Sequence, residues 1–126
     1  MYEANTQRIV QSFFKVYNTL GIGFLESVYE NALTHEIRTR GGIVERQKEI
    51  TVRYEGTTVG HFYADLLVDG AIIVEVKATE VLRNEHEWQL LNYLRATDIE
   101  IGLLAGFGRK PEIRRKVFSN DRKRLS

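Results

Sequence analysis

The chain has 126 residues, a formal net charge of +1, and 43% hydrophobic and 28% charged residues. This length suits one domain that can bury its own core, and the composition is ordinary for a globular protein. The absence of cysteine excludes a disulfide scaffold, thiolate catalysis and cysteine-ligated zinc. The longest hydrophobic run, 71–74, is too short to span a membrane, and the N-terminus shows no signal-peptide pattern, so we expect a cytoplasmic protein.

Hydrophobic periodicity predicts two helices, three strands, a third helix and a last strand. In chain order, these elements are expected at 6–20, 24–40, 50–54, 59–68, 71–77, 84–96 and 100–107. Consecutive apolar residues at 66–68 and 72–74 require cover on both faces of the sheet. The pattern therefore favours an α/β sandwich over a barrel.

The last segment, 108–126, concentrates positive charge. It contains eight Lys or Arg and two acidic residues, a net +6, whereas the rest of the chain sums to −5. Such a segment attracts phosphate backbones, but it is equally typical of a solubilising terminus. The spacing of Ile113, Val117 and Phe118 predicts that part of it forms a short helix packed on the body.

Three charged side chains interrupt the apolar strands: Asp65, Glu75 and Lys77. Burial of a carboxylate is costly, so these positions need a reason. Glu75 and Lys77 are two residues apart and therefore share a face of the sheet. Two carboxylates can hold a hard divalent cation, and a lysine can orient water and offset charge on a phosphate. A buried salt bridge from Lys77 to either acid is the structural alternative.

The loop between the second and third strands decides whether the two acids meet. With a two-residue turn at 69–70, Asp65 and Glu75 would face opposite sides of the sheet. A three-residue loop at 69–71 places them on the same side. Because a metal site needs both acids together, we expect the three-residue loop.

Two helices supply further candidates. Glu26 lies in the first turn of a predicted helix, where the helix dipole favours an acid. His86, Gln89 and Tyr93 form a polar stripe on the third helix, on a different side from Trp88, Leu91 and Arg95. A helix-start acid and a solvated helix face are the structural alternatives. We expect Glu26 and Gln89 to line the same pocket as Glu75.

Four segments, in this order, resemble the GxxExxY family, a small branch of the PD-(D/E)XK nuclease superfamily. They are Gly23-Phe24-Leu25-Glu26-Ser27-Val28-Tyr29, Ala64-Asp65-Leu66-Leu67-Val68, Val74-Glu75-Val76-Lys77 and His86-Glu87-Trp88-Gln89-Leu90-Leu91-Asn92-Tyr93-Leu94. The resemblance covers about 9–107, and Gln89-x-x-x-Tyr93 is also similar to the QxxxY motif of RecB-type nucleases. Ala64 stands where the superfamily name has proline, and Ile22 where many members of the branch have proline.

The resemblance implies an α/β fold in a single domain, 1–126, with a basic C-terminal tail. The core would be the restriction-endonuclease-like αβββαβ arrangement with an extra N-terminal helix, a mixed sheet flanked by helices. Asp65 and Glu75 would be metal ligands, with the backbone carbonyl of Val76. Lys77 would position the attacking water and Glu26 would be the helix-borne acid of the site. Gln89 and Tyr93 would orient the substrate or the site.

Two functions follow from these expectations. The first is a Mg²⁺-dependent deoxyribonuclease, with Mn²⁺ as a substitute and DNA favoured over RNA as the nucleic-acid partner. The basic side chains expected to hold that substrate are Arg109, Lys110, Arg114, Arg115 and Lys116. The second is a non-catalytic module that keeps the fold and binds nucleic acid or protein. The intact set of polar positions favours the enzyme, while strand preference and oligomeric state stay open.

Overall fold

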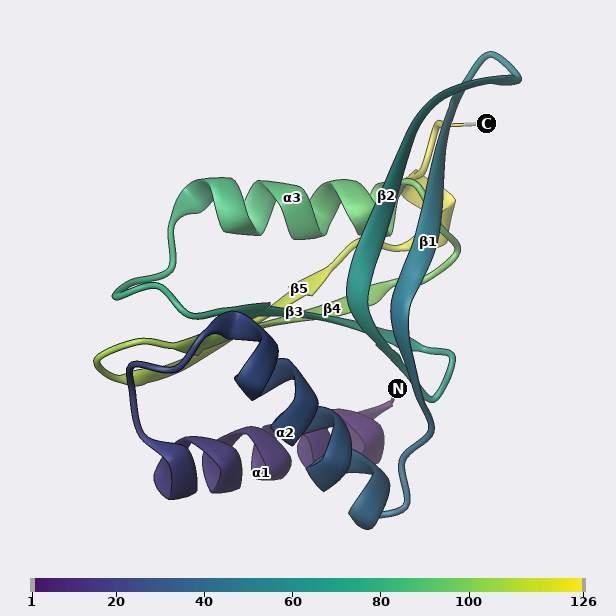
Figure 1. Ribbon diagram of the computed structural model, residues 1–126. Coiled ribbons are helices and arrows are strands. Elements are labelled where there is room, and N and C mark those ends of the chain that lie inside the picture. Colours follow the sequence, from purple (N-terminus) through teal and green to yellow (C-terminus); the bar gives the residue numbers. More distant parts are fainter. Residues whose placement is uncertain (1, 126) are drawn as a thin grey trace.

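Two helices, α1 (Glu3–Leu20) and α2 (Glu26–Thr39), cover one face of a five-stranded sheet in the computed structural model, which describes residues 2–125 (Figure 1). The helix α3 (Asn84–Arg95) covers part of the other face. The strands are β1 (Val44–Tyr54), β2 (Thr57–Val68), β3 (Ile72–Lys77), β4 (Ile101–Phe107) and β5 (Pro111–Val117). No helix within 2–125 is long and apolar enough to cross a membrane.

The sheet has the order β1-β2-β3-β4-β5 and is mixed. The strands β3 and β4 are parallel and are joined through α3, while every other neighbouring pair is antiparallel. This arrangement confirms the predicted α/β core with helices on both faces. The three predicted helices and four predicted strands all form, although β1 begins at Val44 rather than near Ile50.

The basic segment departs from the prediction. Instead of a short helix, 111–117 forms the edge strand β5, which pairs antiparallel with β4 and places Ile113 opposite Ala105. A 3-10 turn, Asn120–Arg122, follows. The predicted helix was wrong because β4 is buried along its whole length, and its outer edge would otherwise leave backbone groups unpaired.

Alternating side chains of the central strands pack into two separate hydrophobic cores, one on each face of the sheet. On the α1/α2 face, the Phe107 ring lies 4.9 Å from that of Phe13 and 4.3 Å from that of Tyr29. On the α3 face, Leu90 and Leu94 pack on a smaller cluster of strand residues. Each strand is therefore anchored on both sides, as its apolar runs require.

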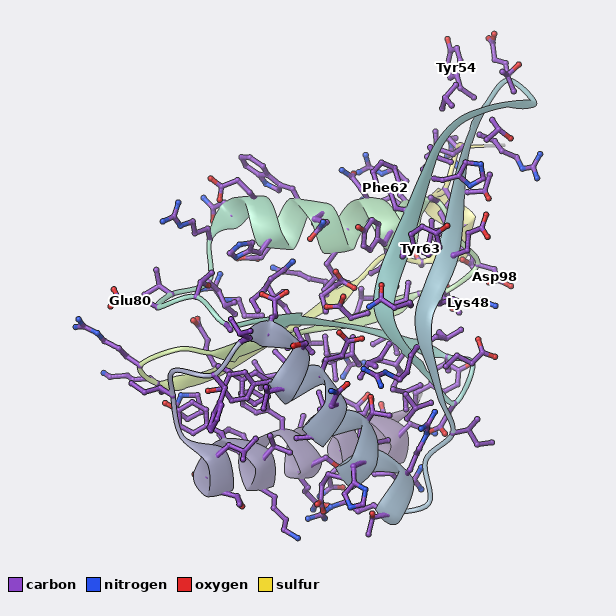
Figure 2. The ribbon with its side chains drawn as sticks, viewed as in Figure 1. Lys48, Tyr54, Phe62, Tyr63, Glu80 and Asp98 are labelled. Carbon is purple, nitrogen blue, oxygen red and sulfur yellow. The ribbon has the colours of Figure 1, made fainter. Side chains whose placement is uncertain are left out.

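The β1–β2 hairpin extends beyond the sheet and rises past the end of α3 (Figure 1). Its strands end in a tight turn at Glu55 and Gly56, and most of its outer half is exposed. Figure 2 shows Tyr54 near the tip and Phe62 on the part that passes α3. The outer half of the hairpin thus forms a wall beside α3, whereas its inner half contributes residues such as Ile50 and Leu66 to the cores.

Candidate active site

The loop between β2 and β3 brings the two predicted acids together. Val68 pairs with Ile72, so the loop is the three residues 69–71, as predicted. Asp69 and Gly70 both have left-handed backbones, with φ of 55° and 63°. Glycine and aspartate tolerate this conformation better than most residues, which explains a tight loop at this point of the chain.

The carboxylates of Asp65 and Glu75 replace part of the β2–β3 ladder. Regular pairing ends at Leu66 and Val74. Beyond it, the Asp65 N–H donates to Glu75 Oε2 at 2.7 Å, and the Val76 N–H donates to Asp65 Oδ2 at 2.8 Å. These reciprocal bonds fix each acid to the strand that carries the other, so both carboxylates are held at one place.

Glu75 is unusually hard to ionise. Its side chain is 2% exposed. Burial, followed by the charges of Asp65 and Glu26, raises the pKa of Glu75 to about 8, against the opposing effects of the Asp65 N–H and Lys77. At neutral pH the buried Glu75 carboxyl therefore favours its protonated, uncharged form.

Lys77 is held by the polar stripe of α3. Its Nζ donates to Gln89 Oε1 at 3.1 Å, and Gln89 Nε2 donates to the Tyr93 hydroxyl at 3.1 Å. Burial, followed by the charge of Glu75, raises the pKa of Tyr93, which keeps the phenol neutral at physiological pH. The predicted stripe thus faces the site: Gln89 contacts Lys77 directly, and Tyr93 acts through Gln89.

Glu26 reaches the same end of β3 from α2, the helix on the other face of the sheet. It is the first residue of α2, and its Oε2 accepts a hydrogen bond of 3.2 Å from the Ala78 N–H. Ala78 directly follows Lys77 at the end of β3. Because the Glu26 charge also raises the pKa of Glu75, the exposed Glu26 carboxylate lies at the rim of the site.

Tyr29 positions Glu26, a role that sequence analysis did not assign. Its ring is fully buried against Phe107, while its hydroxyl donates to the Gly21 carbonyl at 2.6 Å. The same hydroxyl accepts the Phe24 N–H at 3.2 Å. Gly23, between these contacts, has φ of 104°, which strains any other residue. The Gly, Glu and Tyr of the motif thus shape a loop, supply the acid and anchor the loop.

His86 has a structural task. Its Nδ1 accepts a hydrogen bond of 3.0 Å from the Arg83 N–H and so caps the start of α3. Burial, followed by the charge of Lys77, lowers the pKa of His86. This side chain therefore holds the helix that carries Gln89.

The predicted basic side chains are dispersed and partly neutralised. Arg114 and Lys116 both form ion pairs with Glu87 of α3, and Arg109 forms one with Glu80. Lys110 and Arg115 are exposed at the β4–β5 loop and on the edge strand β5. The structure therefore does not gather these five residues at Asp65 and Glu75, and their role in substrate binding stays a prediction.

The family model of the PD-(D/E)XK nuclease superfamily matches residues 3–116, from the start of α1 almost to the end of β5. The chain belongs to the PD-(D/E)XK nuclease superfamily. Comparisons with the curated proteins and with the solved structures find no match to this chain. The narrower GxxExxY branch stays a prediction.

Nucleases of the PD-(D/E)XK superfamily typically use divalent metal ions, and the site suits such a cation. Within residues 2–125, no group of three Asp, Glu, His or Cys side chains could hold a metal ion. The candidate ligands are therefore two carboxylates, those of the half-buried Asp65 and the buried Glu75. In that range, Asp65 Oδ1 and Glu75 Oε1 accept no hydrogen bond, since the backbone N–H groups bind the other oxygens. Two free carboxylate oxygens beside a strongly raised Glu75 pKa match a hard cation.

Proposed function

We propose that this chain is a metal-dependent nuclease that hydrolyses phosphodiester bonds of DNA. One observation carries the proposal: the paired carboxylates of Asp65 and Glu75 lie next to a lysine that Gln89 holds in place. Membership in a nuclease superfamily supports the same reaction class. DNA specificity and the identity of the metal are the finer parts of the proposal.

We further propose Mg²⁺ as the cofactor, with Mn²⁺ as a substitute. Asp65, Glu75 and the Val76 carbonyl would hold it. When bound, such an ion neutralises phosphate charge and makes water a stronger nucleophile. A bound cation would favour the ionised form of both acids, because its positive charge offsets the repulsion between the two carboxylates.

Lys77 orients the water and donates to the phosphate oxygen on which charge develops. Its bond to Gln89 restricts the ammonium to one position, and a preorganised donor needs no rearrangement during the reaction. Tyr93 restricts Gln89 in turn. Glu26, at the rim, accepts a hydrogen bond from water on the open side of the site.

A cleavage assay tests the proposal. Supercoiled plasmid, single- and double-stranded DNA oligonucleotides and RNA of the same sequence are incubated with Mg²⁺, Mn²⁺ or EDTA. We expect metal-dependent DNA cleavage by the wild type, none by Asp65→Asn, and unchanged cleavage by the control Asp98→Asn, whose side chain is exposed at the far end of α3.

The opposite result is equally informative. If the wild type cleaves nothing under any of these conditions and calorimetry detects no Mn²⁺ binding, the chain is a non-catalytic module. In that case the bonds from the Val76 N–H to Asp65 and from the Asp65 N–H to Glu75 serve only to close the gap between β2 and β3.

A further inference from the structure

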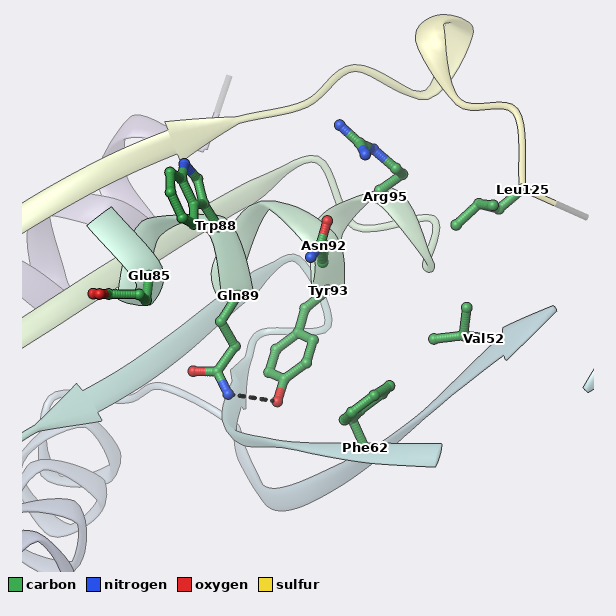
Figure 3. A pocket seen from close by; sticks show the side chains of 9 residues that line it. All are labelled: Val52, Phe62, Glu85, Trp88, Gln89, Asn92, Tyr93, Arg95 and Leu125. Carbon is green, nitrogen blue, oxygen red and sulfur yellow. Dashed lines mark hydrogen bonds between the residues drawn. The ribbon is translucent and has the colours of Figure 1, made fainter. Parts of the chain in front are cut away.

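A groove beside the candidate active site is unexplained by the chemistry of Asp65, Glu75 and Lys77. It has a volume of about 510 Å³ and runs between α3 and the β1–β2 hairpin (Figure 3). Gln89 and Tyr93, which orient Lys77, form part of its wall. The groove therefore adjoins the site through these two side chains.

The groove exposes aromatic rings that a folded domain normally buries. Trp88 is 61% exposed and Phe62 is 46% exposed, and both line the groove. The Phe62 ring lies 5.9 Å from the ring of Tyr93, so it stands one contact away from the residues that hold Lys77. Aromatic faces beside a polymer-cleaving site are platforms for stacked bases.

The amide of Asn92 also lines the groove, one helical turn after Trp88 on the exposed side of α3 (Figure 3). An amide can both donate to and accept from the edge of a base. The groove wall thus combines stacking surfaces with one group suited to polar base edges.

Unneutralised arginines stand at one end of the groove. Arg95 lines it, and Arg95, Arg122 and Arg124 together line an adjoining hollow of about 380 Å³. Arg95 and Arg122 stack on Phe118, at 5.0 and 5.2 Å from its ring centre. Within 2–125, none of these three arginines pairs with a carboxylate, in contrast to Arg114 and Lys116. Phosphates are the complementary ligand for such a cluster.

We infer that this groove binds an unpaired nucleic-acid strand and that its bases stack on Phe62 and Trp88 while its phosphates meet Arg95, Arg122 and Arg124. The substrate class of the site is therefore single-stranded nucleic acid. In a duplex, neighbouring bases already cover both faces of each base, so these rings would gain no stacking partner. This inference rests on the proposed nuclease function.

Trp88 reports binding directly, because it is the one tryptophan of the chain. In EDTA, where no cleavage occurs, the full chain is titrated with oligothymidylate of about 12 nucleotides, a length within the usual span of single-strand sites. A blunt-ended duplex of two separate strands, which has no unpaired loop, is the comparison ligand. We expect the single strand to quench Trp88 fluorescence and to bind at least about tenfold more tightly than the duplex, because only it offers free base faces.

A matched pair of variants isolates the groove. Phe62→Leu removes a ring but keeps an apolar side chain, and we expect it to weaken single-strand binding by about tenfold, measured by anisotropy of a labelled strand. Phe14→Leu, on the exposed side of α1 across the sheet, is the control and should bind as the wild type does. Melting curves of both variants confirm that they fold.

The outcomes separate this inference from the proposed nuclease function. Equal affinity for strand and duplex, or a Phe62→Leu variant that binds as tightly as the wild type, overturns the groove assignment even if the protein cleaves duplex DNA. The groove assignment is also overturned if light scattering shows that the chain is a dimer and iodide fails to quench Trp88, because the partner copy then covers the groove. Tight, Phe62-dependent strand binding without cleavage in any metal supports the groove and instead removes the nuclease proposal.

Discussion

The two faces of the sheet differ in purpose although the same strands build both. Towards α1 and α2, β3 contributes Val74 and Val76 to a core with three contacting aromatic rings. Towards α3, the same strand contributes Ile73 to a smaller core and then Glu75 and Lys77 to the site. Because side chains alternate along a strand, one face can stabilise the strand while the other carries charge.

This difference explains how a carboxylate can be kept 2% exposed. Desolvating Glu75 opposes folding, and the apolar burial on the α1/α2 face offsets that opposition. Damage to the α1/α2 face should therefore lower stability, whereas damage to the polar site should lower activity.

The largest expected effect is on stability. Phe13→Ala should lower the free energy of unfolding by about 3–5 kcal/mol, because the fully buried ring leaves a cavity beside Phe107. The neighbouring Phe14→Ala, on a side chain 38% exposed, should change it by less than about 1 kcal/mol. Urea denaturation measures both. Equal losses for the two variants would contradict the assignment of this face as the scaffold.

The next effect is on catalysis. Lys77→Ala should slow cleavage by about 10²–10³-fold, since one preorganised donor is lost, while Mn²⁺ binding measured by calorimetry persists. Lys15→Ala, which removes an exposed lysine that pairs with the buried Glu36 on the other face, is the control and should cleave at the wild-type rate. A Lys77→Ala protein that melts much earlier than wild type would identify Lys77 as a structural ion-pair partner instead.

The third prediction concerns pH. Folding raises the pKa of Glu75 from 4.5 to about 8, so the unfolded chain releases this proton more readily. The stability of the metal-free protein should therefore be highest below about pH 4.5 with respect to this group, and fall by a few kcal/mol as the pH rises to about 8.

The variant Glu75→Gln tests that origin. It keeps an acceptor for the Asp65 N–H but carries no charge, so its stability should lack this decline between pH 4.5 and 8. Denaturant melts of both proteins in EDTA across this range provide the comparison. Parallel curves for wild type and variant would show that Glu75 does not titrate as described.

The smallest effect links the two faces. Tyr29→Phe keeps the ring in the core but removes the hydroxyl that contacts Gly21 and Phe24. We expect a loss of about 1–2 kcal/mol in stability, together with slower cleavage, because the loop before Glu26 is released. Tyr17→Phe, which removes two hydrogen bonds to the 108–109 backbone, is the control for stability. Cleavage lost equally in both variants would exclude a positioning role for Tyr29.

The local features of this protein could be predicted from the order of its residues. The periodicities predicted three helices and four strands, and spacing alone placed Glu75 and Lys77 on one face. The three-residue loop at 69–71 followed from the requirement that Asp65 join them, and it is confirmed. These features depend on residues that are close together in the sequence, within one helix, strand or turn, and for this reason they are predictable from it.

Which distant residues meet depends on how the elements pack in three dimensions. The bond from Lys77 to Gln89 and that from Ala78 to Glu26 join elements 12 and 52 residues apart, and no period encodes such distances. The strand β5 was missed because its formation depends on the unpaired edge of β4 rather than on its own pattern. Likewise, the composition of the basic segment did not show that Glu87 neutralises Arg114 and Lys116. Charge is read from sequence, but its neutralisation depends on which side chains the fold places within reach.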